Sequence, residues 1–263
     1  MNFDDALKQY LPHAWFRFKF LKYKYFKRGE PELRLIRHLV EPGTTALDVG
    51  ASIGMYAAEM ARYAARVIAF EANPAVAALT TRVAPRNVEV INVALSSAPG
   101  RATLKIPLNP DGRTIDELAT IEAGNPLHAG VAASAEVAVK RLDDFAIANC
   151  SFIKIDVEGH EEAVPDGAAG LIAAQRPAPM VELNDAFNPG VVTRLANRYA
   201  ALSYDVYFLS HGRLRPIAEF DPARDQDDAL LKFPRHKLPR GREYINNFIF
   251  VPLEKRERTL ARI

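Results

Sequence analysis

The segment LDVGASIG, residues 47–54, most constrains how this chain of 263 residues folds. Apolar residues lead into Gly50, and an Ala-rich run that favours a helix follows Gly54. Glycine adopts backbone angles closed to other residues, and it lets a ligand come close to the main chain. The segment therefore predicts a tight turn from a buried strand into a helix, whose free N–H groups face a ligand.

Apolar runs and helical segments alternate after this turn. Strands are expected at residues 45–50, 66–74, 88–95, 151–156, 178–183, 203–209 and 246–253. The alternating segment RATLKI (101–106) is expected to extend an edge of the sheet. The β-α-β-α-β order of the first half predicts an α/β fold with a doubly wound, mostly parallel sheet.

One large domain is expected over residues 30–253, because no second boundary is visible. A basic aromatic helical segment (1–29) precedes it, and a basic tail (254–263) follows. Residues 107–135 are rich in Pro, Gly, Asn and Ala. A loop of this length inside a compact domain is usually functional or mobile, so this stretch is a candidate lid.

The composition excludes several classes of protein. With one cysteine, Cys150, the chain forms no intrachain disulfide and no cysteine-based zinc site. No apolar run reaches the roughly 18 residues that a membrane span requires. The acidic start MNFDD is unlike a signal peptide, so a cytoplasmic location is expected.

Positive charge is concentrated at the two ends of the chain. Residues 1–28 hold seven Lys/Arg against two Asp, and residues 232–263 hold nine Lys/Arg against three Glu. The aromatic and basic segment 10–29 is expected to be a helix docked on the domain. The basic ends fit an anionic acceptor, a peripheral membrane contact or plain solvation, and aromatics near 15–26 are an alternative homodimer face. Nothing else resembles a nucleic-acid-binding module, so no nucleic-acid partner is expected.

Acidic residues end the first two predicted strands. Asp48 precedes Gly50, where a carboxylate repels a phosphate and attracts a cation. The dinucleotide fingerprint G-x-G-x-x-G fails, because Ser52 and Met55 stand at its second and third glycine positions. Glu71 ends the second strand, where a carboxylate accepts hydrogen bonds from both hydroxyls of a ribose. These features together fit a phosphate-free, positively charged adenosine compound, such as S-adenosylmethionine.

The segment IKIDVEGHEE (153–162) crowds carboxylates around Gly159, directly after the fourth core strand. The carboxyl end of that strand faces the ligand crevice of a doubly wound sheet, so Asp156 is expected near the reacting methyl group. His160 is a candidate general base, since a histidine imidazole ordinarily titrates near about pH 6.5. Asp156 would orient His160 or accept the proton itself. Alternatively, Asp156 and Glu182, at the ends of neighbouring strands, would hold Mg²⁺ as metal ligands.

Five segments together resemble the FkbM family of S-adenosylmethionine-dependent methyltransferases: LDVGASIG, AFEANP, NVALSS, IKIDVEGHE and a strand ending in Glu182. The resemblance covers roughly residues 30–252. It implies the class I methyltransferase fold, a Rossmann-like sheet of seven strands with a late antiparallel strand at NNFIFV. It also implies an O-methyltransferase that acts on a hydroxyl group of a sugar, a glycosylated natural product or a lipid-linked glycan.

The resemblance assigns site residues as well. It implies a cofactor pocket formed by Asp48, Gly50, Ala51, Ser52, Gly54, Glu71, Asn92, Ala94 and Leu95. In this assignment the glycine turn holds the methionine end of the cofactor, Glu71 holds the ribose and residues 92–95 line the adenine. Asp156 and His160 are the expected catalytic residues.

Two other functions are open on the sequence alone. An amine acceptor would make the protein an N-methyltransferase with less need for a base. A protein that binds S-adenosylmethionine without turnover fits the same cofactor motifs. Residues 1–29 and 107–135 carry no motif of the family, and the choice of acceptor is expected to depend on them.

Overall fold

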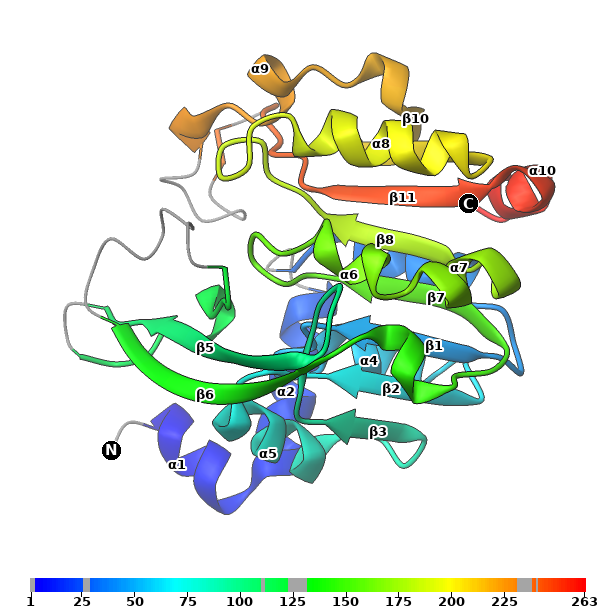
Figure 1. Cartoon of the computed structure of the whole chain (residues 1–263). Coiled ribbons are helices and arrows are strands. Elements are labelled where there is room, and N and C mark those ends of the chain that lie inside the picture. Colours follow the sequence, from blue (N-terminus) through cyan, green and yellow to red (C-terminus); the bar gives the residue numbers. More distant parts are fainter. Residues whose placement is uncertain (1–2, 26–28, 110–111, 123–131, 231–237, 240) are drawn as a thin grey trace.

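The computed structural model describes residues 3–25, 29–109, 112–122, 132–230, 238–239 and 241–263. Within these ranges the centre is a sheet of eight strands in the order β10-β9-β11-β8-β7-β1-β2-β3 (Figure 1). The strands are β1 (Thr45–Val49), β2 (Arg66–Phe70), β3 (Val88–Ile91), β7 (Cys150–Ile155), β8 (Ala178–Glu182), β9 (Tyr204–Ser210), β10 (Arg213–Pro216) and β11 (Asn247–Pro252). The strands from β3 to β8 in this order pair in parallel, whereas β11 pairs antiparallel with β8 and β9. The predicted α/β class, with a mostly parallel sheet and a late antiparallel strand, is confirmed.

The described sheet has one strand more than the seven predicted. The additional strand is β10, which pairs antiparallel with β9. His211 and Gly212 join the two strands with φ angles of 48° and 74°. Consecutive positive φ angles are typical of the tight turns that connect hairpin strands, and glycine adopts them without strain. The His-Gly pair is therefore the sequence signal that the strand prediction missed.

Helices cover both faces of the sheet, as a doubly wound fold requires. Side chains alternate between the two faces along β1, so Leu47 and Val49 pack into one hydrophobic cluster and Ala46 packs into another. The first face packs against α6 (Ala163–Asp166), α7 (Ala169–Gln175) and α8 (Val191–Ala201). The second face packs against α3 (Ile36–Leu39) and α4 (Met55–Met60). The short helix α9 (Pro222–Asp225) lies before β11 in the chain.

A second sheet of three described strands, in the order β4-β6-β5, is separate from the main one (Figure 1). Its strands are β4 (Ala94–Leu95), β5 (Gly100–Pro107) and β6 (Ala132–Lys140). The prediction of one strand over 88–95 is wrong, because the chain leaves the main sheet at Asn92. The side-chain amide of Asn92 donates to the carbonyl oxygens of Glu71 and Ala72, at 2.7 and 3.0 Å. The prediction for 101–106 is also wrong, because β5 pairs with β6 and does not extend the main sheet.

The N-terminal segment forms two helices, α1 (Phe3–Tyr10) and α2 (Pro12–Tyr25). Trp15 and Phe16 of α2 are buried against Ala58 of α4 and Val83 of α5 (Pro74–Val83). The expected docking of an N-terminal helix on the domain is therefore confirmed. At the other end, α10 (Arg256–Leu260) follows β11. Among the helices described, none combines the length and the apolar character that crossing a membrane requires.

Candidate functional site

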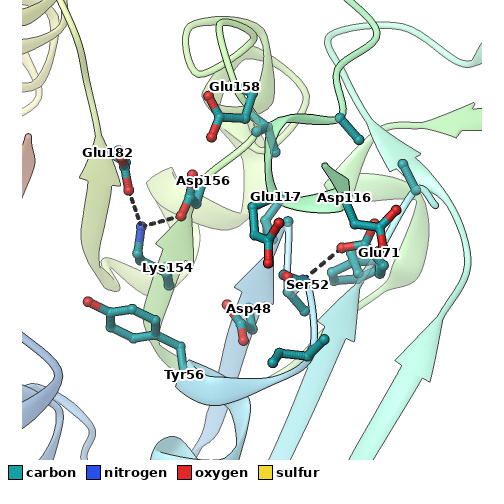
Figure 2. Close-up of a pocket in the computed structure, with 18 of the residues that line it drawn as sticks. Asp48, Ser52, Tyr56, Glu71, Asp116, Glu117, Lys154, Asp156, Glu158 and Glu182 are labelled. Carbon is teal, nitrogen blue, oxygen red and sulfur yellow. Dashed lines mark hydrogen bonds and ion pairs between the residues drawn. The ribbon is translucent and has the colours of Figure 1, made fainter. Parts of the chain in front are cut away.

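A cavity of about 500 Å³ lies where the carboxyl ends of β1, β2 and β7 meet. Its volume is in the range of small-molecule binding sites. Of the residues proposed from the sequence, the cavity is lined by Asp48, Gly50, Ala51, Ser52, Glu71, Ala94, Leu95, Asp156, His160 and Glu182. Figure 2 labels five of these: Asp48, Ser52, Glu71, Asp156 and Glu182. Two proposed residues do not line the cavity. Gly54 is the N-cap residue that precedes α4, with φ 82°, and Asn92 donates the hydrogen bonds to Glu71 and Ala72 described above.

The turn after β1 brings the main chain of two strands into close contact. Gly50 has φ 78°, and its N–H donates to the carbonyl oxygen of Phe70 at 2.9 Å. A Cβ atom on Gly50 would overlap the carbonyl oxygen of Asp156. Asp156 in turn donates its N–H to the carbonyl oxygen of Val49 at 2.9 Å. The glycine is thus required both for its backbone angle and for the approach of the segment that carries Asp156.

Asp48 is a buried carboxylate at the floor of the cavity. Its side chain accepts a hydrogen bond from the N–H of Ala57 at 2.7 Å, and the residue is 2% exposed. Burial raises the pKa of Asp48 to about 7, although the charge of Lys154 and the Ala57 N–H oppose the rise. The negative charges of Asp156 and Glu71 add to the increase in pKa. A cation bound beside Asp48 would favour its ionised form and lower this pKa.

We expect the affinity for S-adenosylmethionine to rise about tenfold between pH 6 and pH 8, because ionised Asp48 attracts the cation and protonated Asp48 does not. Below its pKa of about 7, Asp48 holds a proton that the cation must displace. Calorimetry in buffers of different ionisation enthalpy would measure both the affinity and the released proton. Asp48→Asn should remove the pH dependence, whereas Glu161→Gln, which changes a carboxyl with a pKa also near about 7, should keep it. A pH-independent affinity in the unaltered protein would contradict the role of Asp48.

Glu71 is fixed at the edge of the cavity by two backbone donors. Its Oε2 accepts from the N–H of Ser52 at 2.7 Å (Figure 2), and its Oε1 accepts from the N–H of Asn73 at 2.8 Å. Burial raises the pKa of Glu71, and these two N–H groups oppose the rise. Asn73 also accepts from the N–H of Ala75 at 3.1 Å and so caps α5. Each carboxylate oxygen of Glu71 keeps a lone pair, which suits the two hydroxyls of a ribose.

An apolar wall lies next to Glu71. It is formed by Val93, Ala94, Leu95, Leu104, Ala119 and Ile121. Asp116 and Glu117, from the short helix η2 (Asp116–Leu118), also line the cavity. Both acids belong to the candidate lid, where the sequence carries no motif that would single them out. Residues 110–111 and 123–131 of that lid lie outside the described residues.

Lys154 is the most informative residue that the sequence reasoning missed. It lies on β7 with a side chain 1% exposed, and its Nζ is 3.4 Å from Asp156 Oδ2 and 3.8 Å from Glu182 Oε2 (Figure 2). Burial alone would lower its pKa, but the charges of Asp156 and Glu182 raise the pKa above the usual range. The Nζ also lies 5.2 Å from the ring centroid of Tyr56, in the geometry of a cation–π contact. The available signal was a lysine inside the otherwise uncharged strand CSFIKI.

The Lys154 ammonium takes the position between Asp156 and Glu182 in which a metal was predicted. Burial, followed by the charge of Asp156, raises the pKa of Glu182 well above its usual value. Asn246 donates to the other oxygen of Glu182. Across the described part of the chain, no group of three His, Cys, Asp or Glu residues could hold a metal ion. The Mg²⁺ prediction therefore finds no support.

His160 also lines the cavity, but both of its ring nitrogens have protein partners. Its Nε2 lies 2.8 Å from Ser96 Oγ, and its Nδ1 lies 3.0 Å from Glu122 Oε2. The chain bends directly before it, since Glu158 and Gly159 have φ angles of 50° and 96°. A proton taken up at Nε2 would require the hydrogen bond with Ser96 to rearrange.

Acids outnumber bases in the described lining of the cavity. Three lysines line it: Lys19, Lys22 and Lys154. Eight carboxylates line it: Glu30, Asp48, Glu71, Asp116, Glu117, Asp156, Glu158 and Glu182. Such a lining attracts a cation and repels phosphate groups. It therefore fits the sulfonium and amino groups of S-adenosylmethionine better than it fits a dinucleotide.

Solved structures with a similar fold include methyltransferase FkbM from Methylobacillus flagellatus KT, with 14% identity, a TM-score of 0.50 and coverage of 94% of this chain and 60% of that one. This chain thus spans less than two thirds of the Methylobacillus protein. A TehB-like SAM-dependent methyltransferase from Corynebacterium glutamicum is 11% identical, with 95% and 97% of the two chains covered and a TM-score of 0.43. The likeness to the Methylobacillus protein shows a shared fold, the class I methyltransferase fold that was predicted.

None of the curated proteins compared with this chain matches it. A family model does match, and its description is "Methyltransferase FkbM domain". The match runs over residues 48–206, from Asp48 at the floor of the cavity to β9. It covers more than half of the chain and includes Glu71, Asp156, His160 and Glu182. The chain therefore belongs to the FkbM family of methyltransferases.

Proposed function

We propose that this protein is an S-adenosylmethionine-dependent O-methyltransferase. Its acceptor would be a hydroxyl group of a sugar, a glycosylated natural product or a lipid-linked glycan. The observation that carries the proposal is that Asp48 and Glu71 line the same cavity as Asp156 and Lys154. In Figure 2, Glu71 and Ser52 lie on one side of this cavity, and Lys154 and Asp156 lie on the other. One cavity thus has an end suited to the cofactor and an end suited to the acceptor.

The cofactor end fits each part of S-adenosylmethionine. The two carboxylate oxygens of Glu71 would accept the ribose hydroxyls, and the apolar wall from Val93 to Leu95 would contact the adenine. Asp48 would face the positively charged methionine end. When bound, this cofactor supplies a methyl group on a cationic sulfur, which a lone pair of the acceptor attacks.

An alcohol needs to lose its proton as it is methylated, and Asp156 is the group we assign to that step. Its side chain is 29% exposed and lines the cavity, so an acceptor has access to it. The Lys154 ammonium, 3.4 Å away, holds the carboxylate in place and offsets its charge. His160 is the alternative base, oriented by Glu122 at Nδ1. No step requires a metal ion.

An amine acceptor is the second candidate, and the excess of carboxylates in the lining favours it. A protonated amine would be attracted by these acids, and it would lose its proton to Asp156 before attack. The product would then be an N-methylated amine. The cofactor end of the cavity would be the same for both acceptors.

The two candidates are separated by one experiment. The full chain is incubated with S-adenosylmethionine that carries an isotope-labelled methyl group, together with simple glycosides and amino sugars. Mass spectrometry then locates the label on oxygen or on nitrogen. We expect O-methylated glycosides, whereas label confined to nitrogen would favour the second candidate. Tight cofactor binding with no transfer to any acceptor would count against both and favour a binding protein.

A further inference from the structure

Helix α2 carries a row of exposed apolar side chains on the side turned away from the domain. Leu11, Phe18, Leu21 and Tyr25 are 59%, 57%, 41% and 57% exposed, and together they form the α2 stripe. Their spacing of seven, three and four residues places them along one side of a helix. Leu11 belongs to this helical turn, because its carbonyl oxygen accepts from the N–H of Trp15 at 3.0 Å.

The exposed large hydrophobic residues are concentrated around the α2 stripe and are not scattered over the surface. Eight large hydrophobic side chains are exposed in the described part of the chain, and five of them lie within residues 10–25. The same helix already buries Trp15 and Phe16 against the domain, so its core packing is complete without the stripe. A concentrated apolar surface of this kind marks an interaction site.

The charges around the α2 stripe indicate the kind of partner. Residues 6–25 contain no Asp or Glu, but they contain five Lys/Arg, of which Lys24 is already paired with Glu59. Arg17 is exposed beside Phe18, and the Nζ of Lys22 lies 5.6 Å from the centroid of the Phe18 ring. Aromatic and aliphatic side chains flanked by cations fit an anionic lipid surface, in which the apolar groups enter the acyl boundary and the cations meet the headgroups.

A second copy of this chain fits the α2 stripe less well. In a twofold-symmetric dimer the same patch faces itself, so the cations of one protomer would meet those of its partner. The segment 6–25 offers no carboxylate to compensate for that repulsion. Charge complementarity therefore favours the anionic membrane over a dimer.

The α2 stripe and the cavity share one helix, since Lys19, Lys22 and Tyr23 of α2 line the cavity. We propose that the α2 stripe binds this protein to the surface of an anionic membrane, and that the cavity takes its acceptor from that surface. The second half of this proposal rests on the proposed function, because it makes the acceptor a lipid-linked molecule. The first half stands on the α2 stripe alone.

Vesicle sedimentation with the full chain tests the first half without any methyl transfer. We expect binding to vesicles of phosphatidylcholine and phosphatidylglycerol, little binding to phosphatidylcholine alone, and weaker binding at high salt. The double variant Phe18→Ser/Leu21→Ser should bind at least about tenfold more weakly. The matched control Leu202→Ser/Leu253→Ser removes two leucines that are 42% and 46% exposed elsewhere, and it should bind as the unaltered protein does.

Thermal unfolding should be the same for both double variants, since all four side chains are exposed. Absence of binding to the anionic vesicles, or an equal loss in the control, would overturn the proposal. A dimer in solution that Phe18→Ser/Leu21→Ser dissociates would assign the α2 stripe to a second copy and also overturn it. Failure of vesicle binding leaves methyl transfer to a soluble glycoside unaffected, so the two proposals fail separately.

Discussion

Replacing Asp156 with Asn is expected to reduce the rate of methyl transfer about 10²–10⁴-fold, which is the range for the loss of a general base. The affinity for S-adenosylmethionine should change far less than the rate, because the ribose is assigned to Glu71, which lies across the cavity from Asp156 (Figure 2). Asparagine keeps the size of the side chain, and Lys154 keeps Glu182 as a partner at 3.8 Å. Single-turnover rates and calorimetric affinities would measure the two effects separately.

Two further variants sharpen this result. Asp166→Asn is the matched control, since Asp166 is 52% exposed and pairs with Arg198 away from the cavity. It should retain the full rate. His160→Gln should lower the rate less than Asp156→Asn does. A larger loss in His160→Gln would transfer the role of base to His160, and an unchanged rate in Asp156→Asn would remove Asp156 from the mechanism.

Substituting Ala for Gly50 should unfold the protein or come close to it. Ala at a positive φ costs about 1–2 kcal/mol, and a core overlap adds about 1–3 kcal/mol or more. At Gly50 both terms apply, because its φ is 78° and a Cβ would overlap the carbonyl oxygen of Asp156. We therefore expect the free energy of unfolding to fall by about 2–5 kcal/mol or more, and the cofactor affinity to fall with it.

Gly43→Ala provides the matched control for Gly50→Ala. Gly43 has φ 77°, but a Cβ there would meet no atom within 4 Å. Its substitution should cost only the backbone term of about 1–2 kcal/mol. Denaturant titrations would measure the free energy of unfolding of both variants. The difference between the two losses isolates the cost of the overlap between a Cβ at position 50 and Asp156. Equal losses would show that Asp156 moves aside without cost.

The parts of this fold that depend on local chemistry could be predicted from the sequence. The glycine turn, the acids near the carboxyl ends of β1 and β2 and the Asn-Pro start of α5 follow from backbone geometry and capping. In the structure Gly50 has a positive φ, Asp48 is the last residue but one of β1, Glu71 directly follows β2, and Asn73 caps α5. The bend before His160 follows from the same reasoning, because Gly159 admits a positive φ. Local rules were sufficient at these positions.

The parts that depend on contacts across the chain could not be predicted in the same way. The ion pairs of Lys154 require β8 beside β7, and the position of Glu122 near His160 joins residues 38 apart in the sequence. β5 was assigned to the wrong sheet, because an alternating segment does not indicate which strand it will pair with. These contacts join residues that are far apart in the sequence, so they depend on the tertiary fold and not on local sequence patterns.

The burial of Asp48 also has a consequence for product release. In the proposed function, transfer of the methyl group leaves the sulfur of the spent cofactor neutral, so Asp48 would keep only the cofactor's ammonium group as a cationic partner. An ionised acid that is 2% exposed is then poorly solvated, and uptake of a proton becomes favourable again. The same side chain that attracts fresh cofactor would in this way loosen the spent one, and each turnover would be accompanied by a proton that leaves and returns.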